Sequence, residues 1–261
     1  MSTLYKVVNG FDAISGTAVN GPFQHNNKSL FNFFYRLSAL LLLTLYITPA
    51  LSSDKYQYEY FESQLGYFKE LTLGQYADNN DQRIWKWVND INILMRGEMP
   101  TVLSDDLDSL IAEVNHIISP IQLRRVTSEE QANYFIFLGT AKTYLNFEPS
   151  VSPEWVETGI VYFINTNSGY EITNGSMYID LAMFKQNIHR KYALRDLLSK
   201  SLGISFESPR YADSIFAAPP FKKITLEYSN FDKTIIKKLY SKCVKAGMDK
   251  FELDNALLNG C

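Results

Sequence analysis

The residues that could do chemistry lie close together in the sequence, between residues 189 and 214. His189 lies at the start of a helical pattern, Asp196 lies about two turns further along it, and Glu207 lies in the loop that follows. A histidine and carboxylates are the groups that general acid–base catalysis and metal-assisted hydrolysis use. One hypothesis is therefore a hydrolase, metal-dependent or not, that uses these three residues. For His189, an ordinary surface histidine is the favoured alternative.

An amphipathic helix is predicted from Ile188 to Gly203, and it positions the first two of these residues. Apolar side chains recur at three- and four-residue spacing and form one broad face: Ile188, Tyr192, Leu194, Leu197, Leu198 and Leu202. Gly203 follows the last leucine, where a left-handed residue commonly ends a helix. Asp196 and Lys200 lie four residues apart, and the simplest interpretation is an exposed ion pair worth a few tenths of a kcal/mol.

The loop after this helix contains further polar residues, Glu207 with Ser208 and Asp213 with Ser214. Side chains of these types cap turns by hydrogen bonding to nearby backbone groups. We therefore expect them to fix the geometry of the loop. A pair of carboxylates for acid–base catalysis is the alternative, but spacing within a loop does not establish it.

The composition indicates a globular domain without affinity for nucleic acid. The chain has 261 residues, of which 46% are hydrophobic and 20% charged, enough apolar mass for a core. The net charge is −3, whereas binding to phosphates requires a basic surface. Neither a glycine-rich phosphate loop nor a G-x-S-x-G motif is present in the sequence.

The N-terminal region predicts export. No charged residue occurs from Leu37 to Ser53, and Lys28 and Arg36 precede this apolar run. We interpret residues 30–53 as a signal peptide cleaved after Ser52, with an uncleaved membrane anchor and a buried core helix as alternatives. Residues 1–29 are predicted to be a disordered extension. Residues 54–261 would then form an extracytoplasmic domain, which is periplasmic, secreted or anchored to a membrane.

The chain has only two cysteines, Cys243 and Cys261. In an exported protein they can pair and attach the C-terminal tail to the preceding helix. The alternative is that both are free thiols. Two cysteines are too few for a structural zinc site of the usual four ligands.

The rest of the chain predicts one α+β domain in which strands and helices follow one another. The expected strands are 83–95, 121–126, 134–138, 159–165 and 175–180. Residues 134–138 form a continuous apolar run that suits a central strand buried on both faces. Besides the helix at 188–203, we expect helices at 104–118, 230–246 and 249–258, the first with Ser104 as its N-cap.

Three blocks of sequence resemble a known family in order and spacing. They are L-R-D-L-L-S-K-S-L-G-I-S-F-E-S from Leu194, Y-A-D-S-I-F from Tyr211, and S-N-F-D-K-T-I-I-K-K-L-Y from Ser229 with a later Gly-Met pair. The family is an uncharacterised group of exported bacterial proteins known as domain of unknown function 2927. Its typical members read L-R-E-E-L-T-Q-S-L-G in the first block and D-S-I-F in the second.

The helix of that family in turn looks like the active-site helix of zincin metallopeptidases, H-E-x-x-H-x-x-G. In that motif two histidines bind zinc and the glutamate activates the metal-bound water. Here the three positions hold Asp196, Leu197 and Lys200 when Leu202-Gly203 is aligned. Leu197 cannot act as a base, and Lys200 places a cation where the second ligand should be. The resemblance implies a zincin-like layout, with a mixed or antiparallel sheet packed on a few helices, without zinc or another cofactor.

The leading hypothesis is thus a non-catalytic, zincin-like interaction domain, a pseudoenzyme. It would hold a peptide or an envelope protein in the remnant cleft or along a sheet edge. A divergent extracytoplasmic hydrolase or metallopeptidase and a structural envelope component are the alternatives. A membrane partner follows only if the N-terminal segment remains uncleaved.

Overall fold

The computed structural model describes residues 63–74, 82–98, 100–218 and 223–258. The predicted extension at 1–29 and the predicted signal peptide or anchor at 30–53 lie outside these residues. The described residues from Gly66 onward belong to one compact unit. None of the helices in the described ranges has the length and apolar character needed to cross a membrane.

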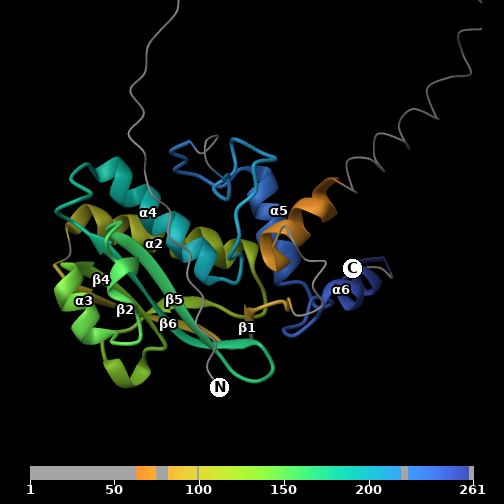
Figure 1. Ribbon diagram of the computed structural model, residues 1–261, viewed down its shortest axis with the longest axis horizontal. Coiled ribbons are helices and arrows are strands. Elements are labelled where there is room, and N and C mark those ends of the chain that lie inside the picture. The colour runs from red at the N-terminus through yellow and green to blue at the C-terminus, as the bar shows by residue number, and fades with distance from the viewer. Residues whose placement is uncertain (1–62, 75–81, 99, 219–222, 259–261) are drawn as a thin grey trace, which may run out of the picture. The chain divides into compact units, whose positions relative to one another are not determined.

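A six-stranded sheet forms the centre of this unit (Figure 1). Its strands are β1 (Lys86–Trp87), β2 (Ile91–Gly97), β3 (Leu123–Arg125), β4 (Tyr134–Gly139), β5 (Ile160–Thr166) and β6 (Glu171–Asp180). The order is β1-β6-β4-β2-β3, and every pair in that series is parallel. The expectation of a mixed or antiparallel sheet is therefore corrected: the sheet is parallel, and antiparallel pairing is confined to the β5–β6 hairpin.

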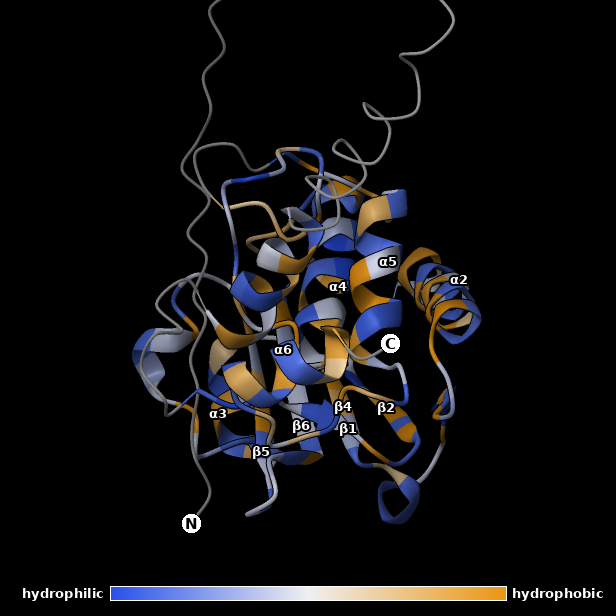
Figure 2. Ribbon diagram, turned by 90° about the vertical axis from the view of Figure 1, so that its right-hand side faces the viewer, coloured by the Kyte–Doolittle hydropathy of each residue, from blue (hydrophilic) through white to orange (hydrophobic). Residues whose placement is uncertain are grey.

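The helices lie on both faces of the sheet. They are a helix over residues 63–73, α2 (Thr101–Ile117), α3 (Ala141–Phe147), α4 (Asn187–Ser201), α5 (Asn230–Leu239) and α6 (Lys250–Leu258). Helix α4 packs on β5 and β6 and beside α2, whereas α3 packs on β4 from the opposite face. Figure 2 shows hydrophobic and hydrophilic residues along α2, whose buried residues recur at helical spacing.

Strand β4 connects the two layers. On one face the Tyr134 hydroxyl hydrogen bonds with the Ser201 hydroxyl of α4. On the other face the Phe137 ring lies 5.6 Å from the Tyr144 ring of α3, between ring centroids. The prediction of a central strand buried on both faces is confirmed, because helices cover both sides of the strand.

The predicted helix is confirmed as α4, but the single apolar face is not: its residues from Tyr192 to Ser201 are buried except Arg195, whereas Ile188 is 43% exposed. The end of the helix requires glycine. Gly203 has a φ of 103°, and a Cβ atom at this position would lie 2.1 Å from the Trp85 carbonyl oxygen. Such a separation is far below van der Waals contact, so a side chain here would displace the backbone that leads into β1.

Three predicted boundaries differ from the structure. The strand expected at 83–95 is divided into β1 and β2 by a bend, and the two parts pair with different neighbours. Helix α2 begins at Thr101 with Pro100 as its N-cap, three residues before the predicted start. Helix α5 ends at Leu239 instead of Ala246, and the Lys86 ammonium binds the carbonyls of Leu239 and Val244 beyond this end.

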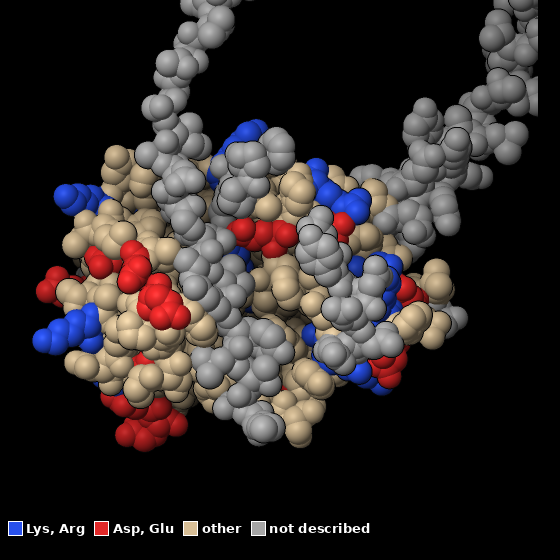
Figure 3. Space-filling model, in the orientation of Figure 1, with Lys and Arg blue, Asp and Glu red and all other residues tan. Residues whose placement is uncertain are grey.

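Charged side chains are mixed on the face of the unit that Figure 3 shows. There the Lys and Arg side chains of the described residues lie in small separate groups, with Asp and Glu side chains between them. This face therefore differs from the continuous basic surface that binding to nucleic acid requires.

Candidate functional site

The acidic and basic residues of α4 form a buried ion network with the loop that follows. The Lys200 Nζ atom lies 2.9 Å from Asp196 Oδ2 and 2.8 Å from Glu207 Oε1. The side chains of Lys200 and Asp196 are 0% and 1% exposed. The prediction of an ordinary exposed pair is therefore wrong. The physical reason is that α4 is enclosed by the sheet, by α2 and by the following loop, which bury its residues from Tyr192 to Ser201 except Arg195.

Two tyrosines share the surroundings of this network. Burial raises the pKa of Tyr162 to about 12, and it also raises the pKa of Tyr192. For both phenols, the Asp196 and Glu207 carboxylates act in the same direction, while the Lys200 ammonium opposes it. Both phenols are thus neutral near pH 7. The network is an enclosed set of two carboxylates and one ammonium, and these two phenols add no charge to it.

The three positions that resemble the metallopeptidase motif hold two members of this ion network and a core leucine. The Lys200 ammonium already binds both carboxylates, Asp196 and Glu207, and a divalent cation would be repelled by it. Leu197, at the position of the general base, is buried in the core with 2% exposure. Within the described ranges, no three His, Cys, Asp or Glu side chains come together as metal ligands.

His189 does not join Asp196 and Glu207. It lies in the first turn of α4, seven residues before Asp196, which corresponds to about 10 Å of rise along the helix. The three residues of the hypothetical hydrolase site are thus not within hydrogen-bond reach of one reacting group. Only Asp196 and Glu207 are brought together, and Lys200 connects them.

The polar residues of the loop after α4 hold the loop to neighbouring elements. The Ser208 hydroxyl donates to Glu70 Oε2 at 2.7 Å, and Arg210 Nε donates to Glu70 Oε1 at 2.7 Å. Although burial opposes it, hydrogen bonds from Arg210 and Ser208 lower the pKa of Glu70. Asp213 instead forms an ion pair with Lys223 on the surface, where the two side chains are 84% and 65% exposed.

Ser214 belongs to a buried chain of hydrogen bonds. Tyr67 donates its hydroxyl proton to Ser214 Oγ at 2.7 Å, and Ser214 Oγ donates to Asp232 Oδ1 at 2.5 Å. Asp232 Oδ2 accepts from the Ser229 backbone at 2.9 Å, which caps α5. Because Ser214 and Asp232 are 2% and 0% exposed, this serine has no access to a substrate. It connects the helix at 63–73, the D-S-I-F segment and α5.

Cys243 is disulfide-bonded. The second cysteine of the sequence, Cys261, lies outside the described residues.

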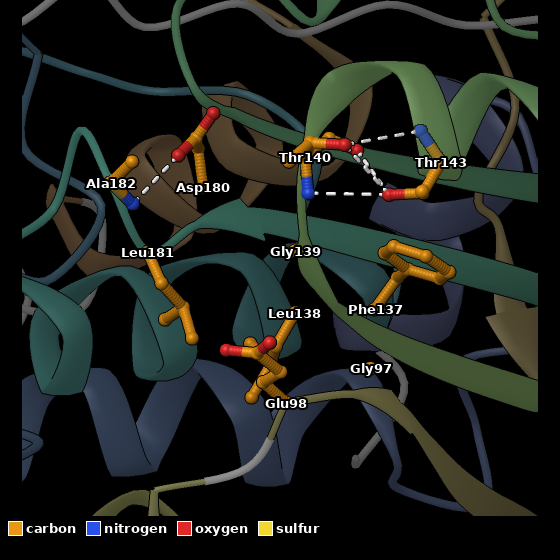
Figure 4. Close-up of a pocket in the computed structure, with 10 residues that line it drawn as sticks. All are labelled: Gly97, Glu98, Phe137, Leu138, Gly139, Thr140, Thr143, Asp180, Leu181 and Ala182. Carbon is orange, nitrogen blue, oxygen red and sulfur yellow. Dashed lines mark hydrogen bonds between the residues drawn. The ribbon is translucent and has the colours of Figure 1, made fainter.

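A pocket of 360 Å³ lies outside the carboxyl ends of β2, β4 and β6. Figure 4 shows Thr140 and Thr143 on one side of it and Leu181 and Ala182 on the other. The residues that line it are Gly97, Glu98, Phe137, Leu138, Gly139, Thr140, Thr143, Asp180, Leu181 and Ala182. None of these residues was singled out as a site from the sequence.

The topology of the sheet explains why a pocket forms there. The chain leaves β2 toward α2 on one face and leaves β4 toward α3 on the other, although β2 and β4 are adjacent and parallel. Two connections that diverge in this way leave a crevice between them at the carboxyl edge of the sheet. In open parallel sheets this crevice is the usual place for ligand binding.

Carboxylates and hydroxyls are the polar groups of the pocket, and none of its ten residues is basic. The Asp180 carboxylate is held in place, because Oδ1 accepts from the Ala182 backbone at 2.8 Å and Oδ2 accepts from the Tyr178 hydroxyl at 2.9 Å. The hydroxyls of Thr140 and Thr143 lie 2.9 Å apart in a capping box at the start of α3. Glu98 is exposed, and no other side chain in the described residues binds its carboxylate.

Gly97 allows the two central strands to approach closely at the floor of the pocket. Gly97 has a φ of 87°, and a Cβ atom there would lie 1.7 Å from the Leu138 carbonyl oxygen. The Glu98 backbone N–H donates to this oxygen at 3.2 Å. The sequence signal for the pocket was a glycine as the last residue of each of two apolar strands, in R-G-E and L-G-T. Its meaning depends on knowing that the strands are adjacent and parallel.

The fold and the pocket together define an α+β domain with a ligand-sized crevice at the carboxyl edge of a parallel sheet. Residues 62–259 match the family described as "Protein of unknown function (DUF2927)", and the chain belongs to this family. The family resemblance expected from the sequence is confirmed. Neither a curated protein nor a solved structure matches the chain.

Proposed function

We propose that the chain is a non-catalytic, extracytoplasmic binding domain that holds an amine-bearing group of a peptide or envelope protein in the pocket at the carboxyl edge of the sheet. One observation carries this proposal. The pocket lies at the topological switch point between β2 and β4, and it offers the Glu98 and Asp180 carboxylates without a basic residue in its lining. An N-terminal amine or a lysine side chain complements these charges.

The α4 network supports a binding role over a catalytic one. Its Asp196 and Glu207 oxygens are used by an internal ammonium, so they do not offer a free base or a metal ligand to a substrate. In this interpretation the pseudoenzyme helix has kept its place in the core while its former ligand positions contribute to stability. The zincin relationship itself is part of the proposal.

Export is the other part of the proposal, and the apolar run at residues 37–53 supports it. If the signal peptide is cleaved after Ser52, the mature protein begins at Ser53. N-terminal sequencing of the protein from its native host tests this point. A mature chain that still contains residues 1–52 would favour the uncleaved anchor, and recovery in the cytosol would contradict export.

Calorimetric titration with the tripeptide Lys-Ala-Ala tests the binding site. Hydrogen bonds to charged groups contribute about 1.5–3 kcal/mol, so E98Q should weaken binding at least about tenfold. D213N is the matched control, because it removes a carboxylate that is 84% exposed on the surface and outside the pocket. Equal affinities for wild type and E98Q, or tighter binding of the N-acetylated peptide with norleucine in place of lysine, would contradict the proposal.

Incubation of the same peptide with the protein and zinc, followed by mass spectrometry, separates binding from hydrolysis. We expect the peptide to remain intact. Cleavage that a chelator abolishes would instead establish the divergent hydrolase.

A further inference from the structure

A second pocket, of 470 Å³, lies at the amino end of β6, opposite the end that Asp180 occupies. It is formed by β1 and the following Val88, by residues 120–121, and by the segment 240–246 after α5. Its charged residues are Lys86, Lys242, Lys245 and one carboxylate, Glu171. The balance of charge is therefore opposite to that of the pocket at the carboxyl edge.

Lys86 is the central group of this second pocket. Its residue is only 8% exposed, and its Nζ atom donates to the carbonyl oxygens of Leu239 and Val244, each at 2.8 Å. The Nζ atom also lies 5.1 Å from the centroid of the Tyr240 ring. An ammonium has three N–H donors, and in the described part of the chain carbonyl acceptors occupy two of them.

No carboxylate in the described residues forms an ion pair with Lys86. The carbonyls at the end of α5 offset part of the cost of burying its charge, since a helix carries a partial negative charge at its C-terminus. A buried ammonium without a counter-ion is nevertheless unfavourable, and burial lowers the pKa of Lys86 to about 8. The Glu171 carboxylate lines the same pocket but forms no ion pair with Lys86 in the described residues; its Oε2 accepts from Asn167 Nδ2 at 2.8 Å.

The remaining walls of the pocket suit an apolar body. Val88 is a large hydrophobic residue that is 40% exposed, and Ile121 and Val244 line the same space. Lys242 and Lys245 are exposed beside it. A volume of 470 Å³ is within the usual range for sites that bind small molecules.

The geometry points to a binding site for a small organic anion, a monocarboxylate with an apolar chain. Its carboxylate accepts the third N–H of Lys86 and is attracted by Lys242 and Lys245, while its chain packs against Val88 and Ile121. This site is separate from the proposed amine-binding pocket, and its ligand is an anion instead of a cation.

The test is a calorimetric titration of the full-length protein with octanoate at pH 7, with the uncharged octanamide as the matched control. Octanoate should bind and octanamide should not. K86M should weaken octanoate binding at least tenfold. The double variant K242E/K245E changes only exposed side chains and should weaken it several-fold, so it keeps the test decisive if K86M does not fold.

Variant E98Q serves as the control for the other pocket and should leave octanoate binding unchanged. The dependence on pH supplies an independent readout. Since Lys86 must be protonated to attract the anion, the affinity for octanoate should fall as the pH rises above 8. The other charged or titratable groups that line the pocket around Lys86 are Glu171, Lys242, Lys245 and Tyr240. Absence of octanoate binding, or affinity unchanged in K242E/K245E and in a folded K86M, would overturn the proposal. Those results would leave the test with Lys-Ala-Ala unaffected.

Discussion

Lys200→Met isolates the energetic role of the buried ion network. The substitution keeps most of the side-chain volume but removes the ammonium that lies 2.9 Å from Asp196 and 2.8 Å from Glu207. Breaking a buried ion pair by removing one partner costs about 3–5 kcal/mol, because the remaining charges stay buried without compensation. For a domain of this size, each kcal/mol lowers the melting temperature by about 2–4 °C, so a decrease of about 6–20 °C is expected.

The assay is urea denaturation at pH 7, followed by circular dichroism. Lys223→Met is the matched control, since its ion pair with Asp213 is largely exposed and should contribute little. The triple variant D196L/K200M/E207L should recover most of the lost stability, because an apolar replacement of a whole buried network leaves no charge unpaired. A free energy of unfolding for K200M within about 1 kcal/mol of the wild type would refute the reasoning, since an uncompensated buried charge should cost several times more.

Two further substitutions test the end of α4 and the contacts of the loop that follows it. Gly203→Ala should lower the free energy of unfolding by at least about 2 kcal/mol, since residue 203 has a positive φ and a Cβ atom there would meet the Trp85 carbonyl oxygen. An unchanged free energy of unfolding in urea would contradict the close approach of Gly203 to Trp85. Glu70→Gln should make the free energy of unfolding depend less on pH in the acidic range. Because Arg210 and Ser208 lower the pKa of Glu70 in the folded protein, its contribution is complete above about pH 5 and is lost as the pH falls through the folded-state pKa. Identical pH dependence of urea stability in E70Q and wild type would exclude this contribution.

The elements with strong local patterns were predictable from the sequence. The periodicity of α4 and the helix-ending Gly203 gave its position within a few residues, and the apolar run Tyr134–Leu138 gave a central strand. These features depend on residues close together in the chain. The pairing of the strands depends on residues far apart, so the parallel arrangement could not be read from the same patterns.

The candidate sites were harder to predict for the same reason. The spacing of Asp196 and Lys200 indicated an ion pair, but their burial depends on the loop that contains Glu207 and on the packing of β5 and β6 over α4. The pocket at the carboxyl edge involves Gly97 and Gly139, which are far apart in the sequence and come together only when β2 and β4 pair. Lys86 likewise acquires its partners from the end of α5.

The most direct test of the central claim is to map the binding of Lys-Ala-Ala onto the protein by ¹⁵N–¹H correlation NMR. Binding at the carboxyl edge of the sheet predicts shifts of the backbone amide signals of Gly97, Gly139 and Thr140, while that of Lys200 remains in place. Shifts centred on Lys200 and Glu207, or no saturable shifts at all, would contradict a binding site at the pocket between β2 and β4.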